Sequence, residues 1–74
     1  MVRLTDLPDG QIGRLVALEG DRAFRRRLME LGLLPGTPVR VVRRADIGGA
    51  LELEVRRARL TLRTSEASLV LVAP

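Results

Sequence analysis

Apolar and polar residues alternate along much of the chain, and this period of two is typical of short β-strands with one buried face. The alternation predicts strands over residues 12–18, 37–44, 50–55, 59–63 and 69–72. It is clearest in residues 50–55, where glutamate separates leucine or valine at every second position. Short turns favour antiparallel neighbours, so we expect a small, partly open barrel of five strands around one aliphatic core.

The first predicted strand has two faces that could be buried. One face carries Ile12, Arg14, Val16 and Leu18, and the other begins at Gly13. We expect the first face, which holds three of the large apolar side chains, to point to the core. Gly13 inside the strand indicates a bend or a close approach of another part of the backbone.

Between the first and second strands the pattern changes to that of a helix. Asp21 is a good N-cap, and Gly32 fits the left-handed position that follows a last helical turn, so a helix is expected over residues 22–31. Its inward stripe is expected at i, i+4 and i+7, namely Phe24, Leu28 and Leu31. The residues off this stripe are Arg22, Arg25, Arg26 and Met29.

Turn-forming residues connect these elements. Residues 4–10 predict a short turn or a single helical turn, with Leu4 and Leu7 facing inward. Residues 46–49 are expected to turn the chain back, and residues 64–67 to form one helical turn capped by its own threonine or serine. The cap and turn positions predicted around the longer helix are Asp21, Gly32, Pro35 and Gly36.

Composition narrows the function by what is missing. The 74 residues suffice for one domain, and they include no His, Cys, Tyr or Trp and a single Phe, Phe24. The usual general base, nucleophilic thiol and imidazole or thiolate metal ligands are therefore missing. We expect a protein that is not an enzyme, acts on no small-molecule substrate and holds no cofactor or metal. One Phe cannot supply the aromatic platforms on which single-stranded nucleic acids stack.

All 13 basic residues are arginine, and with 9 acidic residues they give a net charge of +4. The exclusive use of arginine reflects either GC-rich codons or bidentate recognition of carboxylate or phosphate. A basic cluster of Arg56, Arg57, Arg59 and Arg63 indicates either a nucleic-acid or membrane surface or a solvated rim balanced by glutamates. The basic charge favours nucleic acid, and the shortage of aromatic residues disfavours it.

The chain contains no run of 18 apolar residues, and its first residues lack the long apolar core of a signal peptide. We therefore expect a cytoplasmic protein. No repeat, linker or low-complexity segment interrupts the pattern, so residues 1–74 are expected to form one domain.

Five segments together resemble the FeoA family. Residues 25–37 resemble its basic helix running into Leu-x-x-Leu-Gly-(apolar)-x-Pro-Gly-(Ser/Thr), and residues 39–45 resemble the strand that follows. Residues 60–63 match an (apolar)-x-Leu-Arg element, and residues 66–72 match the closing strand. Residues 4–10 match the family's opening Leu-x-x-Leu-Pro-x-Gly. The ordered series at matching spacing makes the resemblance specific.

The resemblance implies a mainly β fold, a small SH3-like five-stranded barrel with one inserted helix over about residues 22–31. It also implies a role beside FeoB, the membrane ferrous-iron transporter with a cytoplasmic G-protein domain. In that role the family member is a modulator or scaffold and not the iron carrier. The same fold occurs as a terminal domain of iron-dependent repressors.

One segment departs from the family pattern. Where the family usually has Ala-Pro-Leu-Gly-Asp-Pro, residues 45–50 are Ala-Asp-Ile-Gly-Gly-Ala, so both prolines are lost. Two glycines still allow a tight turn, and we expect the fold to be retained. The altered Asp46–Gly49 hairpin is expected to change any partner contact made there.

The candidate partner-binding residues lie on the helix, in the turn after it and at the end of a strand. Arginines at positions 25–27 fan over about 200° of a helix, so all three cannot face one partner. The two leucines of the turn either close the end of the barrel or join an exposed apolar patch. The full candidate set is Arg25, Arg26, Met29, Leu33, Leu34 and Arg63.

Two strand glutamates form a separate candidate. Glu52 and Glu54 share a face and are expected either to pair with Arg40 or Arg59 on neighbouring strands or to bind a hard cation. The leading functional hypothesis remains a cytoplasmic module that docks on a FeoB-type transporter. The alternatives are a small nucleic-acid-binding barrel and a detached regulator-type SH3-like domain.

Overall fold

A computed structural model describes residues 1–45 and 49–74. Its elements are β1 (Val2–Arg3), the 3-10 turn η1 (Leu4–Asp6), β2 (Ile12–Leu18), α1 (Arg22–Glu30), β3 (Pro38–Arg44), β4 (Ala50–Val55), β5 (Ala58–Arg63), α2 (Thr64–Ala67) and β6 (Val70–Ala73). The five predicted strands, the main helix and both short helical turns are confirmed, with bounds that differ by a residue or so. The predicted turn over residues 46–49 lies outside the described residues, except for Gly49.

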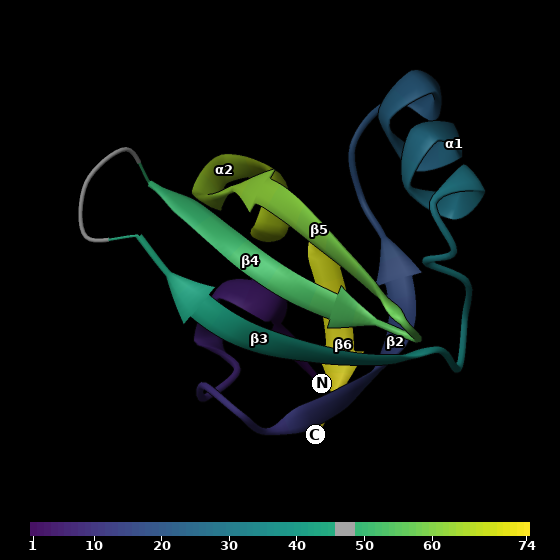
Figure 1. Cartoon of the computed structure of the whole chain (residues 1–74). Coiled ribbons are helices and arrows are strands. Elements are labelled where there is room, and N and C mark those ends of the chain that lie inside the picture. The colour runs from purple at the N-terminus through teal and green to yellow at the C-terminus, as the bar shows by residue number, and fades with distance from the viewer. Residues whose placement is uncertain (46–48) are drawn as a thin grey trace.

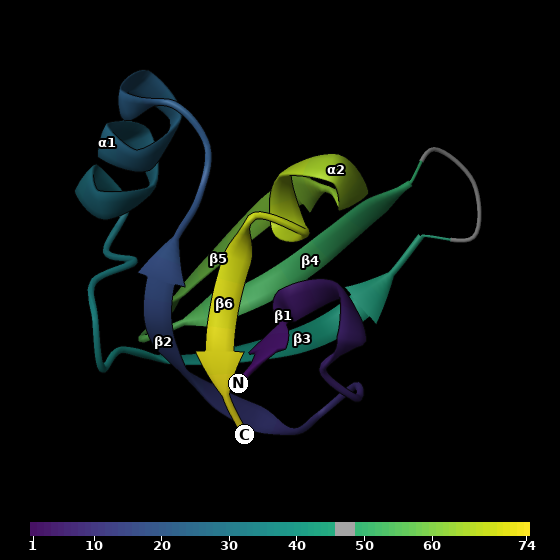
Figure 2. The same cartoon turned by 180° about the vertical axis from the view of Figure 1, so that it is seen from behind.

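The strands form one antiparallel sheet in the order β1-β6-β2-β3-β4-β5. β2 pairs with β3 through residues 12–14 and with β6 through residues 14–18, so the sheet curls around the core (Figures 1 and 2). The predicted mainly β, SH3-like fold is confirmed, and its barrel is open, as expected, but it has one strand more than the five predicted. Among the described residues the sheet has six strands, and its ends, β1 and β5, do not pair with each other.

The extra strand is too short for an alternation pattern to reveal. β1 consists of Val2 and Arg3, which pair with Val72 and Leu71 of β6. It leads directly into η1, which places Leu4 and Leu7 at 0% exposure in the core, as predicted. The core is aliphatic and comprises Leu4, Leu7, Leu15, Leu28, Leu33, Val39, Val41, Leu51, Leu53, Val55, Leu62, Ala67, Val70 and Val72.

β2 turns the opposite face to the core from the one predicted. The exposed residues include three that were expected to be buried: Ile12, Arg14 and Val16. Leu18 is half-buried, whereas Gly13 and Leu15 are buried. A Cβ at Gly13 would lie 3.0 Å from Cγ2 of Val72, so a side chain at position 13 would crowd the side chain that packs here from β6. A β-bulge between Leu15 and Ala17 then changes the pairing with β6.

Both ends of α1 follow the sequence signals. The Asp21 carboxylate accepts a hydrogen bond of 2.8 Å from the Phe24 amide, which confirms the N-cap. At the other end Gly32 has a φ of +102°, which confirms the left-handed position. Gly32 N–H donates to the Met29 carbonyl and Leu33 N–H donates to the Leu28 carbonyl, the pair of bonds that defines a Schellman motif.

This motif corrects the predicted inward stripe. Leu31 is 47% exposed, while Leu33 is fully buried beside Leu28 in the core. The left-handed residue reverses the chain after Leu31 and sends the next leucine inward. Phe24 is half-buried, so of the predicted stripe only Leu28 is a fully buried core residue.

The cap of α2 also differs from the prediction. Arg63 is the N-cap residue, and its N–H donates a 2.9 Å hydrogen bond to Oε1 of Glu66. The predicted capping by Thr64 or Ser65 is therefore wrong, because Thr64 is already the first residue of the helix and the cap position falls on Arg63.

Candidate functional site

A groove of about 540 Å³ lies between α1 and β2. In Figures 1 and 2, α1 stands beside the end of β2 and away from the centre of the sheet. The groove is lined by Leu15, Ala17, Leu18, Arg22, Arg25, Arg26, Met29, Leu33 and Pro35. We call it the α1–β2 groove; its apolar floor comes from β2 and the turn after α1, and its wall comes from α1.

The wall of the α1–β2 groove is one face of the helix. Arg22, Arg25, Arg26 and Met29 follow the i, i+3, i+4, i+7 spacing of residues that share a helical face. Leu28 anchors the helix to the core from a different face. Phe24 packs against the core as well, and the groove face is left in solvent; Met29 is 43% exposed there, as expected for a residue off the inward stripe.

The arginines on this wall differ from most others in the protein. Among the described residues, Arg22, Arg25 and Arg26 form no ion pair within the chain. Arg27, on the other side of the helix, is 2.5 Å from Glu66 and lies 5.6 Å from the centre of the Phe24 ring. The α1–β2 groove therefore combines an apolar floor with positive charge that nothing in the described chain neutralises.

The Arg27–Glu66 contact joins α1 to α2. Glu66 accepts hydrogen bonds from the Arg63 amide and from the Arg27 guanidinium, and these two bonds lower the pKa of Glu66 below its ordinary value. A carboxylate held in this way stays ionised and keeps the two helices linked.

Four of the six predicted binding residues meet at the α1–β2 groove: Arg25, Arg26, Met29 and Leu33. Leu33 belongs to its buried floor, so of the two alternatives for this leucine the one that closes the fold is confirmed. Leu34 is 43% exposed just beyond the lining residues. Arg63 lies elsewhere, in a second depression that also contains Arg27.

Sequence reasoning missed part of the groove. Arg22 could have been found, because it begins the same helical face as Arg25, Arg26 and Met29. The contribution of β2 could not be found once its buried face had been assigned wrongly. Pro35 was predicted as a turn residue and also lines the groove.

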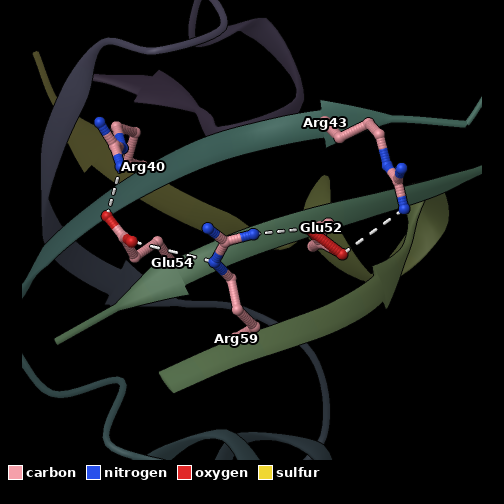
Figure 3. Close-up of polar contacts among 5 residues, drawn as sticks. All are labelled: Arg40, Arg43, Glu52, Glu54 and Arg59. Atoms are coloured by element: carbon pink, nitrogen blue, oxygen red, sulfur yellow. Dashed lines mark hydrogen bonds and ion pairs between the residues drawn. The ribbon is translucent and has the colours of Figure 1, made fainter. Parts of the chain in front are cut away.

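The outer face of β3, β4 and β5 carries the second candidate cluster (Figure 3). Glu54 lies 2.6 Å from Arg40, and Glu52 lies 2.9 Å from Arg59. Longer contacts of 3.8 Å join Glu52 to Arg43 and Glu54 to Arg59. The predicted cross-strand pairs are confirmed. Among residues 1–45 and 49–74, no three His, Cys, Asp or Glu side chains are grouped to hold a metal ion.

The curved antiparallel sheet, with one helix inserted after β2, places the chain in the class of small SH3-like domains. The model of the FeoA domain matches residues 2–74. The chain belongs to the FeoA domain family.

Solved structures agree with this assignment. The FeoA protein of Chlorobium tepidum has 33% identity and a TM-score of 0.90, over 97% of this chain and 69% of that one. FeoA of Stenotrophomonas maltophilia, solved with zinc, has 34% identity and a TM-score of 0.80, over 93% of this chain and 86% of that one. It is described as a prokaryotic SH3 domain protein and a candidate ferrous iron transport activating factor.

A manganese-dependent transcriptional repressor shares the fold, with a TM-score of 0.86 and 21% identity over 96% of this chain and 40% of that one. Family membership thus connects the chain with ferrous iron transport accessory proteins, whereas the likeness to the repressor is one of fold alone.

In the part of the chain that the structure describes, no helix is both long and apolar enough to cross a membrane.

Proposed function

We propose that this protein is a non-enzymatic, cytoplasmic interaction module that docks on a FeoB-type ferrous iron transporter through the α1–β2 groove. The observation that carries the proposal is the groove itself, in which exposed Met29 and an apolar floor lie beside three arginines that form no ion pair with the described residues. Protein interfaces combine a desolvated apolar centre with a polar rim, and arginine and methionine are enriched in them.

The chemistry of the side chains supports a binding role. The chain has no His or Cys, and the glutamates of the outer face are held by arginines at 2.6 and 2.9 Å. These glutamates are engaged in ion pairs across the strands, and the chain lacks the residues that usually serve as general base or nucleophilic thiol. The α1–β2 groove contains no acidic residue among those that line it.

Family membership supports the choice of partner. The chain belongs to the FeoA domain family, and a relative of 34% identity is described as a candidate ferrous iron transport activating factor. The partner expected from this context is the cytoplasmic part of the transporter. The surface that meets the α1–β2 groove is expected to be acidic around one or two large apolar side chains, because it must complement three arginines and fill an apolar floor.

The test is a titration of the chain against the cytoplasmic domain of the FeoB-type transporter, with GDP and with a GTP analogue, at low and high salt. We expect saturable binding that persists at high salt because its centre is apolar. The double variant Arg25→Glu/Arg26→Glu should weaken binding, whereas Arg57→Glu, an exposed charge reversal outside the groove, should not. Absence of binding in both nucleotide states would contradict the proposal.

The same experiment separates the nucleic-acid alternative, which the net charge of +4 favours. Binding to phosphates releases counterions and weakens steeply as salt rises. Salt-sensitive binding to DNA or RNA, together with no binding to the transporter domain, would replace docking by nucleic-acid recognition.

A further inference from the structure

β5 is an end strand of the sheet, and its free side carries hydrogen-bonding groups. Val55 and Ala58 pair across the two-residue turn that joins β4 to β5, so even-numbered residues of β5 bond to β4. The Thr64 amide bonds to the Gly49 carbonyl, and the Arg63 amide bonds to Glu66 instead of β4. Both contacts agree with the assignment of the even-numbered residues of β5 as those that bond to β4.

The odd-numbered residues of β5 therefore point their backbone groups away from the sheet. For Arg59 and Thr61 both the N–H and the C=O face the free side. Among the described residues, no backbone hydrogen bond joins either residue to an element other than β4. For Arg63 the C=O faces the same side. A row of such groups is a template on which an extended segment adds as a further strand.

A depression of about 510 Å³ adjoins this free side. Its lining includes Thr61, Leu62 and Arg63 of β5, and Arg27 and Leu31 from α1 and its C-cap. Leu31, which the sequence placed in the core, is 47% exposed here. The ion pair of Arg27 with Glu66 holds the far wall in place. α1 separates this depression, the β5-edge site, from the α1–β2 groove.

Charge selects the occupant of the β5-edge site. In the self-pairing of two copies with the greatest overlap, Thr61 would face Thr61 and Arg59 would face Arg63 of the other copy. Like charges directly opposite each other destabilise a strand pair, so the edge disfavours a second copy. A strand with acidic residues at those two positions would instead form favourable cross-strand pairs. The stronger of these is expected at Arg63, which has no ion pair among the described residues, because Glu52 and Glu54 already lie 2.9 and 3.8 Å from Arg59.

We propose that the β5 edge binds an extended acidic peptide segment by strand addition. The peptide places acidic side chains opposite Arg59 and Arg63 and an apolar side chain near Leu31. This site is distinct from the α1–β2 groove, and the proposal does not rest on docking of the transporter there. Backbone hydrogen bonds supply the affinity and the arginines supply the selectivity.

The test uses the full chain, labelled for NMR, and a short synthetic peptide in which glutamate alternates with valine. We expect saturable binding, with the amides of Arg59 and Thr61 shifted and protected from exchange. The matched peptide with lysine in place of glutamate should bind about tenfold more weakly or not at all. A glutamate–valine peptide N-methylated at alternate residues on its pairing side should not bind, whereas methylation of the other amides should be tolerated.

Two variants complete the experiment. Arg63→Glu should reverse the preference between the acidic and basic peptides without changing the fold, because this side chain is exposed. Arg25→Glu/Arg26→Glu should leave peptide binding unchanged, which distinguishes binding at the β5-edge site from binding at the α1–β2 groove. The proposal is overturned if neither peptide binds, if both bind equally, or if binding survives methylation of the pairing amides.

Discussion

Arg44 Nε lies 2.5 Å from Oδ1 of Asp9 and so ties the end of β3 to the N-terminal turn. The same guanidinium donates to the carbonyl oxygens of Thr5 and Leu7. A β-bulge between Val41 and Arg43 shifts the register of β3 and turns Arg44 toward these acceptors. One arginine thereby satisfies polar groups of a turn whose leucines are fully buried.

Replacing Arg44 should measure this role. Arg44→Ala is expected to lower the free energy of unfolding by about 2 kcal/mol, because it leaves carbonyl groups near the core without a charged donor. The control is Arg43→Ala, whose side chain is 78% exposed and should change stability by less than about 0.5 kcal/mol. Urea unfolding checks both, and equal effects would show that Arg44 is an ordinary surface charge.

Gly13 should tolerate no side chain while Val72 is present. Gly13→Ala places a methyl group 3.0 Å from Cγ2 of Val72, and overpacking of this kind costs about 1–3 kcal/mol. In the double variant with Val72→Ala, the cost of adding the methyl at position 13 should be smaller but not zero, because Cγ2 of Val72 is removed while Cβ of residue 72 and Cδ2 of Leu7 remain 3.1 and 3.3 Å away. A double-mutant cycle by thermal unfolding measures this coupling, and additive effects would contradict the close approach of β2 and β6.

Leu33 and Leu34 are neighbours with opposite surroundings, which makes them a matched pair. Leu33→Asp should unfold the protein, because it puts an unpaired charge at a position with 0% exposure. Leu34→Asp should keep the native circular dichroism spectrum, because Leu34 is 43% exposed. We further expect Leu34→Asp to abolish binding to the transporter domain. A folded Leu34→Asp variant with unchanged affinity would remove Leu34 from the docking surface.

Glu66 should give the stability a specific pH dependence. Its pKa in the folded protein is below the ordinary value of 4.5, so its stabilising contribution is fully present above pH 4.5 and is lost as the pH falls through the lower folded pKa. Glu66→Gln should therefore flatten the stability profile in this acidic range and leave its shape at neutral pH unchanged. Urea unfolding at a series of pH values checks the slope, and identical slopes for both proteins would contradict the assignment.

Local signals predicted most of the elements. The alternation in residues 50–55 and the cap residues Asp21 and Gly32 identified β4 and both ends of α1, because each signal acts within a few positions of the chain. The buried face of β2 could not be found in the same way. It depends on the contact between Gly13 and Val72, which lie near opposite ends of the sequence.

The α1–β2 groove was predictable to the same extent. The helical spacing of Arg25, Arg26 and Met29 placed them on one wall, since that spacing is fixed by the helix itself. The exchange of Leu31 for Leu33 as the buried leucine required the geometry of the Schellman motif. That exchange exposed an apolar residue at the β5 edge, where the sequence indicated only a strand.

The position of α1 between the α1–β2 groove and the β5-edge site gives the two sites a common wall. The helix contributes Met29 to one side and Arg27 to the other, and among the core residues Leu28 is its anchor. A ligand that tilts this wall from one side alters the width available on the other. Any such effect must be reciprocal, because thermodynamic linkage gives each ligand the same influence on the affinity of its counterpart.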